Sequence, residues 1–284
     1  MALCLSGAPV AEKLDVETAQ RVLALKVRGV TPTLGILRVG EKADSLAYEK
    51  SAVKRCEKVG IAVHHGVIPK NAGQDEVFSF LNALNRVQGI HGILILSPLP
   101  EQMDTAAVYA ALDPKKDVDG VTDTSLSGVF TGGGHGFTPC TAQACLEILD
   151  FYGIECGGKR AVVLGRSLVV GKPVSMLLLD RDATVTLCHT KTADAGALCR
   201  EADIVIAAAG KMEAFTGDYF SPGQTVLDVG IHWDAAAGRL RGDVKADEAG
   251  SIVAALSPVP GGVGSVTTSV LARHVVRAAE NSAL

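Results

Sequence analysis

Two glycines six residues apart, Gly165 and Gly171, stand between a strongly apolar segment and a segment with helical character. A turn from strand into helix points backbone N–H groups and the positive end of a helix dipole at a ligand above it. Glycines let a phosphate group come close to the backbone. The pattern lacks the full three-glycine dinucleotide motif, and a tight turn without a ligand would use the same residues. Its setting favours a phosphate site.

The end of the next apolar segment indicates which cofactor carries that phosphate. An NAD site usually presents an acid there, about 20 residues after the glycines, to hold the ribose 2′-hydroxyl. Here the segment ends Leu187-Cys-His-Thr-Lys191, without an acid. Arg166, Thr190 and Lys191 offer charge-assisted hydrogen bonds to a 2′-phosphate, unless Lys191 is merely solvated and His189 an ordinary loop residue. We therefore expect NADP rather than NAD.

Helix-like and strand-like patterns alternate along the chain, which is typical of an α/β fold with mostly parallel sheets. The first half predicts strands over 33–39, 61–68 and 91–96. Between them it predicts helices over 8–28, 45–59 and 74–85, with Ser45 as a helix N-cap. The second half predicts strands over 160–164, 183–188, 203–208 and 225–229. The helices expected there cover 171–179, 193–200 and 265–279.

A stretch rich in Gly, Asp, Thr and Pro, residues 113–139, reads as irregular chain that marks a domain boundary. We therefore expect a catalytic domain formed by residues 1–138 together with the last helix, 265–284. A dinucleotide-binding domain would occupy residues 139–264.

Composition excludes several classes of protein. The net charge of −4 over 284 residues gives no general reason to bind nucleic acid or an acidic membrane surface. No apolar run approaches the length of a membrane helix, and the N-terminus does not resemble a secretory signal. The seven cysteines form no CxxC pair and the histidines are scattered, so we expect neither a disulfide framework nor a metal site. A reducing, cytoplasmic location is the expectation.

Several motifs recur in a fixed order: Val39-Gly40, Ser45-x-x-Tyr48, Ser97-Pro-Leu-Pro100, Lys116-Asp-Val-Asp-Gly120, Pro139-Cys-Thr141, Gly165-Arg-Ser167 and Pro258-Val-Pro-Gly-Gly-Val-Gly264. With these motifs nearly the whole chain resembles the methylenetetrahydrofolate dehydrogenase/cyclohydrolase family. The resemblance implies two α/β domains flanking a cleft, the second Rossmann-like and NADP-binding, and a homodimer. It also implies oxidation of 5,10-methylenetetrahydrofolate to the methenyl form, which most members then hydrolyse to 10-formyltetrahydrofolate.

The resemblance gives roles to individual residues. Tyr48 matches a tyrosine that stacks on the folate, and Asp119 a carboxylate that hydrogen-bonds the pterin; without the family they would be a half-buried helix residue and a turn residue. We expect the turn role for Asp117. The folate-binding positions are Tyr48, Ala52, Ile95, Leu96, Ser97, Asp119, Pro260, Gly261 and Gly262. The cofactor-binding positions are Gly165, Arg166, Ser167, Thr190, Ile231 and Thr267, although Ile231 could equally be a core residue.

Two of these positions depart from the family. A catalytic lysine is expected four residues after the tyrosine, and a supporting glutamine two residues before Pro98; this chain has Ala52 and Leu96. Lys50 and Lys54 are turned roughly 160° and 120° away from Tyr48 on a helix. Arg55 returns to the Tyr48 face, but a guanidinium does not release its proton in proteins.

Three interpretations follow. The first is a dehydrogenase with weak or absent cyclohydrolase, because hydride transfer does not need the missing lysine. The second is a fully bifunctional enzyme whose proton relay uses water or another residue. The third is a non-catalytic folate- or nucleotide-binding regulatory subunit, against which the intact Gly-Arg-Ser turn and Pro-Gly-Gly loop argue.

Overall fold

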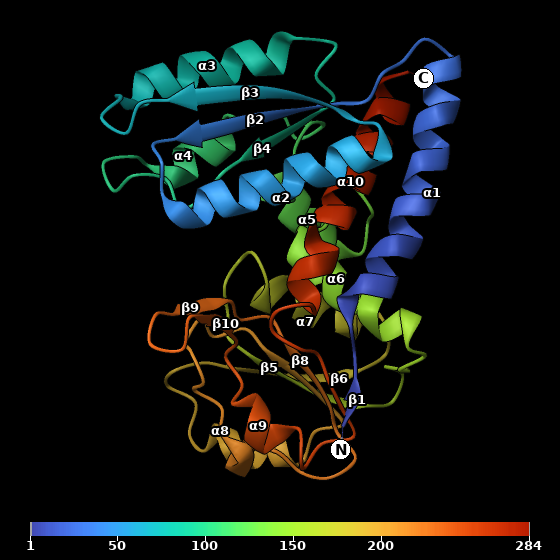
Figure 1. Ribbon diagram of the computed structural model, residues 1–284, viewed down its shortest axis with the longest axis vertical. Helices are drawn as coiled ribbons and strands as arrows, with labels where there is room; N and C mark the ends of the chain where they lie inside the picture. Colours follow the sequence, from blue (N-terminus) through green and yellow to red (C-terminus); the bar gives the residue numbers. More distant parts are fainter. Residues whose placement is uncertain (1, 284) are drawn as a thin grey trace. The chain divides into compact units, whose positions relative to one another are not determined.

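The computed structural model describes residues 2–283, which fold into two compact units (Figure 1). The three-stranded unit contains residues 13–140 and 268–283, and the six-stranded unit contains residues 2–12 and 141–267. The helices α1 (Gly7–Val27) and α10 (Val263–Ser282) contribute residues to both units. No helix among the described residues is long and apolar enough to span a membrane.

Parallel strands β2 (Thr33–Val39), β3 (Ala62–Ile68) and β4 (Gly92–Ile95) form the smaller sheet, in the order β3-β2-β4. Helix α2 (Ala43–Val59) leads from β2 to β3, and α3 (Gln74–Arg86) leads back across β2 to β4. These right-handed crossovers run in opposite directions along the sheet, so the two helices cover opposite faces (Figure 1).

Burial on both faces explains the apolar run of β2, which is buried from Leu34 to Val39. Leu37 belongs to a core cluster with Val77 and Leu81 of α3. Arg38 points to the opposite face and forms an ion pair with Glu49 of α2. The predicted strand and helix types of this half are therefore confirmed, with bounds shifted by two residues at most.

Two details of the predicted first half are wrong. Helix α2 begins at Ala43 after Lys42 as N-cap, so Ser45 is a buried residue of its first turn rather than the cap. The stretch 113–139 holds a helix, α5 (Asp123–Thr131), and α4 (Thr105–Ala110) precedes it. Both helices are short, and glycine-rich chain around α5 hides its periodicity.

The larger sheet is parallel, in the order β1-β11-β8-β7-β5-β6. Its strands include β5 (Arg160–Leu164), β7 (Ile204–Ala207), β8 (Thr225–Asp228) and the edge strand β6 (Thr184–Cys188). Helices α7 (Gly171–Leu179) and α8 (Ala195–Arg200) connect β5 to β6 and β6 to β7. The chain runs outward from β5 to β6 and then returns to the other side of β5 at β7. This reversal confirms a Rossmann-like unit, whose ligand is expected beyond the carboxyl ends of β5 and β7.

Short elements complete the six-stranded unit. The edge strand β1 (Leu3–Cys4) pairs with β11 (Ala255–Leu256), so residues 2–12 belong to this unit and not to the one expected for 1–138. The others are the 3₁₀ turn η1 (Gly217–Tyr219), the hairpin of β9 (His232–Asp234) and β10 (Arg239–Arg241), and α9 (Ala246–Ala249).

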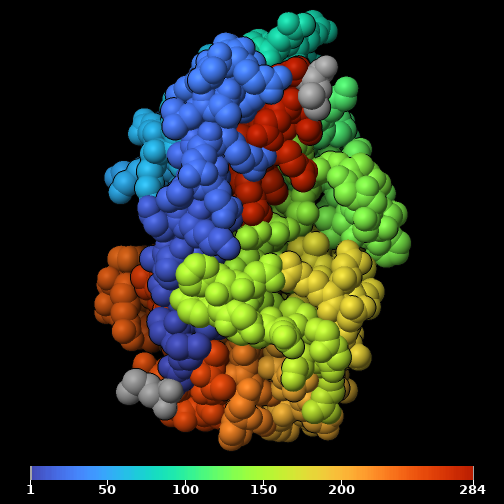
Figure 2. Space-filling model, turned by 90° about the vertical axis from the view of Figure 1, so that its right-hand side faces the viewer, coloured from blue at the N-terminus to red at the C-terminus, as the bar shows by residue number. Residues whose placement is uncertain are grey.

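Within the three-stranded unit, the end of α10 lies beside α1 (Figure 2). The Arg21 guanidinium donates to both carboxylate oxygens of Glu280, at 2.9 and 2.6 Å. Asp15, which is 3% exposed, accepts from the Ser269 hydroxyl at 2.8 Å. These polar contacts fix α1 against α10.

Candidate active site

The glycine turn between β5 and α7 is packed too closely for side chains. A Cβ on Gly165 would lie 2.0 Å from the Ala208 carbonyl oxygen, and one on Gly171 would lie 2.0 Å from the Gly165 carbonyl oxygen. The Ser167 hydroxyl accepts from the backbone N–H of Val170 at 3.1 Å, which ties the loop to the start of the helix. Both glycines are therefore required by the turn itself.

A cavity of about 680 Å³ opens at the carboxyl ends of β5, β6 and β7. It brings together the predicted turn Gly165–Ser167 and Thr190, and the Arg166 side chain is exposed there. Asp194 also lines the cavity, but its carboxylate caps α8 by accepting from the Ala197 N–H at 3.0 Å. A basic side chain without an acid at the end of β6 suits a ribose 2′-phosphate better than a free 2′-hydroxyl.

Three further cofactor candidates lie outside this cavity. Lys191 is exposed, and its backbone N–H donates to His189 Nδ1 at 3.1 Å. Ile231 is 57% exposed, so its reading as a core residue is wrong. Thr267 is 6% exposed, and its hydroxyl donates to the Val263 carbonyl at 3.3 Å. The roles of these residues at the cofactor stay predictions.

The sequence did not predict a role for Asp243, whose side chain fixes a loop that lines this cavity. Its buried carboxylate accepts from the backbone N–H groups of Ala209 at 2.6 Å, Gly210 at 2.9 Å and Lys211 at 2.9 Å. It also contacts His232 Nε2 at 2.7 Å. Asp243 therefore holds the loop after β7, part of which lines the cavity. An Asp in a polar loop has no sequence signal that distinguishes this role from a surface turn.

In the three-stranded unit, Tyr48 is held by the anchoring of α2. The buried face of this helix consists of Ser45, Glu49, Ala52, Cys56 and Val59. Glu49 bonds to Arg38 Nε at 2.6 Å and to His65 Nδ1 at 2.9 Å, so it ties the helix to two strands. Breaking such a buried pair typically costs about 3–5 kcal/mol. The neighbouring Tyr48 side chain is half-buried at the edge of this face.

Asp119 lies in a loop whose backbone is fixed from two other segments. The preceding carbonyl, of Val118, accepts from Cys140 Sγ at 3.2 Å and from His274 Nδ1 at 2.9 Å. The Cys140 N–H donates to the Asp119 carbonyl at 3.4 Å. Gly120 follows with φ +74°, and a Cβ there would lie 2.5 Å from the Pro139 nitrogen.

The structure brings Asp119 close enough to Tyr48 for its charge to affect the ionisation of the tyrosine. Burial, and then the negative charge of Asp119, raise the pKa of Tyr48 well above its usual value, so its phenol stays protonated. Burial raises the pKa of Asp119 to about 7; a hydrogen bond with Cys140 opposes the shift, and the charge of Asp117 adds to it. Asp119 thus changes charge near neutral pH, which is typical of functional carboxyls.

Asp117 has the turn role expected for it. One carboxylate oxygen accepts from the Val121 N–H at 3.0 Å, and the other accepts from the Thr122 N–H at 2.8 Å and from the Ser125 hydroxyl at 2.6 Å. The predicted Ser97 is exposed, and its hydroxyl is hydrogen-bonded to the hydroxyl of Tyr109.

The predicted glycine loop after β11 belongs to the six-stranded unit. Gly261 has φ +100°, and its carbonyl accepts from the Gly7 N–H at 2.7 Å. A Cβ on Gly262 would lie 2.4 Å from the Pro258 carbonyl oxygen. As at Gly165, the backbone alone requires glycine here, so these residues do not by themselves indicate a ligand. Pro260 is exposed beside them.

Comparison with known proteins identifies the family. The profile of the tetrahydrofolate dehydrogenase/cyclohydrolase catalytic domain matches residues 5–119, and that of its NAD(P)-binding domain matches residues 139–283. The chain belongs to this family. It is 46% identical to the bifunctional protein FolD of Carboxydothermus hydrogenoformans, over 99% of this chain and 98% of that one. The family resemblance, and the assignment of a dinucleotide-binding unit, are thereby confirmed.

Solved structures of the same family match throughout. The bifunctional FolD enzyme of Campylobacter jejuni superposes with a TM-score of 0.96 at 34% identity, over 99% of both chains. FolD of Trypanosoma brucei, solved with NADP and an inhibitor, gives a TM-score of 0.94 at 34% identity over 99% and 98% of the two chains.

The two departures from the family occupy buried positions. Ala52 is 1% exposed and Leu96 is 3% exposed, while Ile95 before it is 4% exposed. The Arg55 guanidinium is bonded to Asp15, and its Nε lies 3.3 Å from the Thr268 hydroxyl. Within residues 2–283, no lysine of α2 replaces the missing one: Lys50 and Lys54 are exposed, and Lys58 pairs with Asp15 at 2.9 Å.

Proposed function

We propose that this enzyme oxidises 5,10-methylenetetrahydrofolate to the methenyl form with NADP, and that it hydrolyses the methenyl product little or not at all. One observation carries the second half of the proposal. The chain keeps the tyrosine and carboxylate that the family resemblance assigns to folate, Tyr48 and Asp119, whereas the family's lysine and glutamine positions hold the buried apolar side chains of Ala52 and Leu96.

The residues at the cavity of the six-stranded unit fit NADP. Arg166 and Thr190 would hold the 2′-phosphate, and the Gly165–Ser167 turn at the start of α7 would hold the diphosphate. Ile231 and Thr267 are the positions proposed for the nicotinamide end. When bound, NADP supplies the hydride acceptor, so the protein has to orient the folate and exclude water.

In the three-stranded unit, Tyr48 and Asp119 would orient the folate. The protonated phenol of Tyr48 offers a stacking ring with a hydrogen-bond donor, and Asp119 offers a carboxyl for the pterin. Ile95, Leu96 and Ser97 would line the folate site of this unit. Pro260, Gly261 and Gly262 of the six-stranded unit are the other positions proposed to bind folate. Neither Tyr48 nor Asp119 has to move a proton for hydride transfer.

Hydrolysis, unlike hydride transfer, requires a group that accepts a proton, since water must lose a proton as it adds to the methenyl carbon. General acid–base groups usually contribute about 10²–10⁴ to such a step. Ala52 cannot move a proton. Because Leu96 replaces the glutamine as well, no buried polar partner is left unsatisfied, and the two changes together favour a specialised dehydrogenase.

A second candidate function, the fully bifunctional enzyme, rests on Asp119. This carboxyl has its pKa raised to about 7 by burial, so it can accept and release a proton at neutral pH. In that alternative, Asp119 takes over the role of the lysine, and the product is 10-formyltetrahydrofolate.

Product analysis separates the two functions. The purified enzyme is given 5,10-methylenetetrahydrofolate and NADP, and NADPH, methenyl and 10-formyl products are quantified by chromatography over time. Our proposal expects methenyltetrahydrofolate to accumulate in step with NADPH, and 10-formyltetrahydrofolate to form no faster than from methenyltetrahydrofolate in buffer. Rapid 10-formyl production would favour the bifunctional alternative, and absence of NADPH would refute both.

We further infer a homodimer and a cytoplasmic location. Trp233 and Ile231 of the six-stranded unit are 64% and 57% exposed in the single chain. Large apolar side chains exposed in this way are typical of a surface that another protein chain covers. All seven cysteines are free and six of them are buried, which suits a reducing compartment. Light scattering that gives the mass of one chain, unchanged with concentration, would contradict the dimer.

A further inference from the structure

A second, larger cavity of about 1290 Å³ lies within the three-stranded unit. Its lining includes Val30, shortly before β2, and His91, directly before β4. It therefore opens at the amino ends of these parallel strands. Leu96 and Ser97 follow the carboxyl end of β4, so this cavity is distinct from the proposed folate site.

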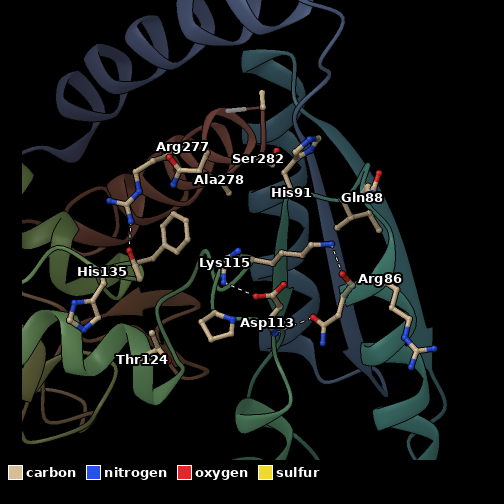
Figure 3. A pocket seen from close by; sticks show the side chains of 18 of the residues that line it. Arg86, Gln88, His91, Asp113, Lys115, Thr124, His135, Arg277, Ala278 and Ser282 are labelled. Atoms are coloured by element: carbon tan, nitrogen blue, oxygen red, sulfur yellow. Dashed lines mark hydrogen bonds between the residues drawn. The ribbon is translucent and has the colours of Figure 1, made fainter.

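Arginine and lysine side chains outnumber acidic ones in the lining of this cavity (Figure 3). Arg86 and Lys115 on one side are exposed, and neither forms an ion pair with a described residue. Asp113 is the one acidic residue among the described lining residues, and its carboxylate accepts from the Lys115 backbone N–H at 2.9 Å. The Lys116 ammonium donates hydrogen bonds to the Asn85 and Val87 carbonyls at 2.7 and 2.8 Å, so it is less available to a ligand than Arg86 and Lys115 are.

The opposite side of the cavity presents a fixed arginine. The Arg277 guanidinium lies 4.2 Å from the centre of the Phe137 ring and donates to the Gly136 carbonyl. Its Nε is buried without a hydrogen-bond partner. Among residues 2–283, no carboxylate forms an ion pair with Arg277, whereas burial and then the charges of Arg273 and Arg21 lower its pKa. Within this part of the chain, the positive charge on this side therefore lacks a balancing anion.

We propose that this cavity binds the polyphosphate group of a small molecule between Arg277 on one side and Arg86 and Lys115 on the other. Guanidinium and ammonium groups are the usual phosphate ligands of proteins. Basic side chains on two sides of the cavity suit a chain of several phosphates better than they suit a single phosphate. The volume of about 1290 Å³ exceeds that of a single oxyanion and lies above the range of about 300–1,000 Å³ typical of small-molecule sites, so it leaves room for several phosphates. The described residues contain no group of three or more His, Cys, Asp or Glu that could hold a metal, so the phosphates would bind to the basic side chains directly.

Calorimetric titration with inorganic tripolyphosphate tests the proposal. The full-length enzyme is first saturated with NADP, so that the phosphate-binding turn of the other unit is occupied. We expect one tripolyphosphate per chain to bind, and the double variant Arg86→Ala/Lys115→Ala to bind at least about tenfold more weakly, equivalent to about 1.4 kcal/mol. Citrate, which carries carboxylates, should bind more weakly than tripolyphosphate.

The matched control is Lys50→Ala/Lys54→Ala, which removes two exposed positive charges from α2 of the same unit. This variant should retain wild-type affinity within about twofold, as expected for distant screened charges. The proposal is overturned if tripolyphosphate does not bind the wild type, if both double variants lose affinity equally, or if citrate binds more tightly. Thermal unfolding of each variant shows that the protein is folded.

Discussion

At the scale of single residues, Arg166 is the side chain that we propose selects NADP over NAD. Its exposed guanidinium is the basic group of the glycine turn between β5 and α7, and the end of β6 presents no acid. We expect wild-type kcat/KM to favour NADP over NAD by at least about tenfold, which is worth about 1.4 kcal/mol. Arg166→Ala should remove most of that preference by weakening NADP and leaving NAD nearly unchanged.

Steady-state kinetics with both cofactors checks this prediction. Arg160→Ala is a suitable control, since Arg160 is an exposed residue at the start of β5, the strand that precedes the glycine turn. Its guanidinium lies 3.8 Å from the Glu201 carboxylate, a long distance for an ion pair. It should leave both cofactors unaffected. Equal loss of NADP and NAD in Arg166→Ala, or a wild-type preference for NAD, would contradict the assignment.

The raised pKa of Asp119 predicts how the free energy of unfolding depends on pH. Its folded pKa of about 7 lies above the value of about 3.9 in an unfolded chain, so between these values the folded state binds the extra proton. The contribution of Asp119 to the free energy of unfolding is therefore largest below about pH 4 and is lost as the pH rises to about 7. Asp119→Asn, which stays neutral, should flatten this decline and gain stability relative to wild type at pH 8.

Urea unfolding of wild type and Asp119→Asn across this pH range measures how the free energy of unfolding changes with pH. Steady-state kinetics of Asp119→Ala tests whether Asp119 binds the pterin. If Asp119 holds the pterin, the variant should lose folate turnover while its affinity for NADP changes little. Simultaneous loss of both would indicate a folding defect rather than a lost pterin contact. An unchanged KM and kcat for folate would remove Asp119 from the proposed site.

At the scale of elements, Asp243 links the region after β9 and β10 to the loop after β7. Asp243→Asn replaces an acceptor oxygen by an NH₂ group facing buried N–H donors or His232. Each unsatisfied buried group costs about 1–3 kcal/mol, so we expect the free energy of unfolding to fall by about that amount or more. The displaced loop should also raise KM for NADP.

Unfolding in urea and NADP kinetics test this expectation together. Asp247→Asn, on the exposed side of the short α9 in the same unit, is the control and should change neither. An Asp243→Asn variant that is destabilised but binds NADP normally would show that the loop does not take part in cofactor binding.

The elements differ in how far sequence predicts them. Strand β2 was predictable to the residue, because burial on both faces leaves a mostly apolar run in which Arg38 is the one charged residue. Strand β1 has two residues, too few for any periodicity, and its pairing with β11 joins residues more than 250 positions apart. Ser45 was mistaken for an N-cap because serine is a preferred N-cap residue, whereas tertiary packing buries it within the first turn of α2.

At the scale of the whole molecule, motif order predicted the family, and the alternation of strand-like and helix-like patterns predicted the parallel sheets. Neither predicted which residues support the site. The glycine turn and Asp119 stand in recognisable motifs. His274 and Cys140 support Asp119 only because α10 and the start of α6 (Cys140–Phe151) meet at the Val118 carbonyl. Contacts between segments so distant in sequence depend on the fold, and no local pattern encodes them.

The central claim, a dehydrogenase that has lost hydrolysis, is tested most directly by supplying methenyltetrahydrofolate and following its disappearance without NADP. We expect the wild-type enzyme to hydrolyse it at nearly the rate of buffer. The double change Ala52→Lys/Leu96→Gln should raise the rate by about 10²-fold or more, and by more than the two single changes combined, because the new side chains would contact each other. Thermal unfolding must show that the variant is folded, since both positions are buried. Wild-type hydrolysis orders of magnitude faster than buffer would contradict the claim and make Asp119 the first candidate for the proton carrier.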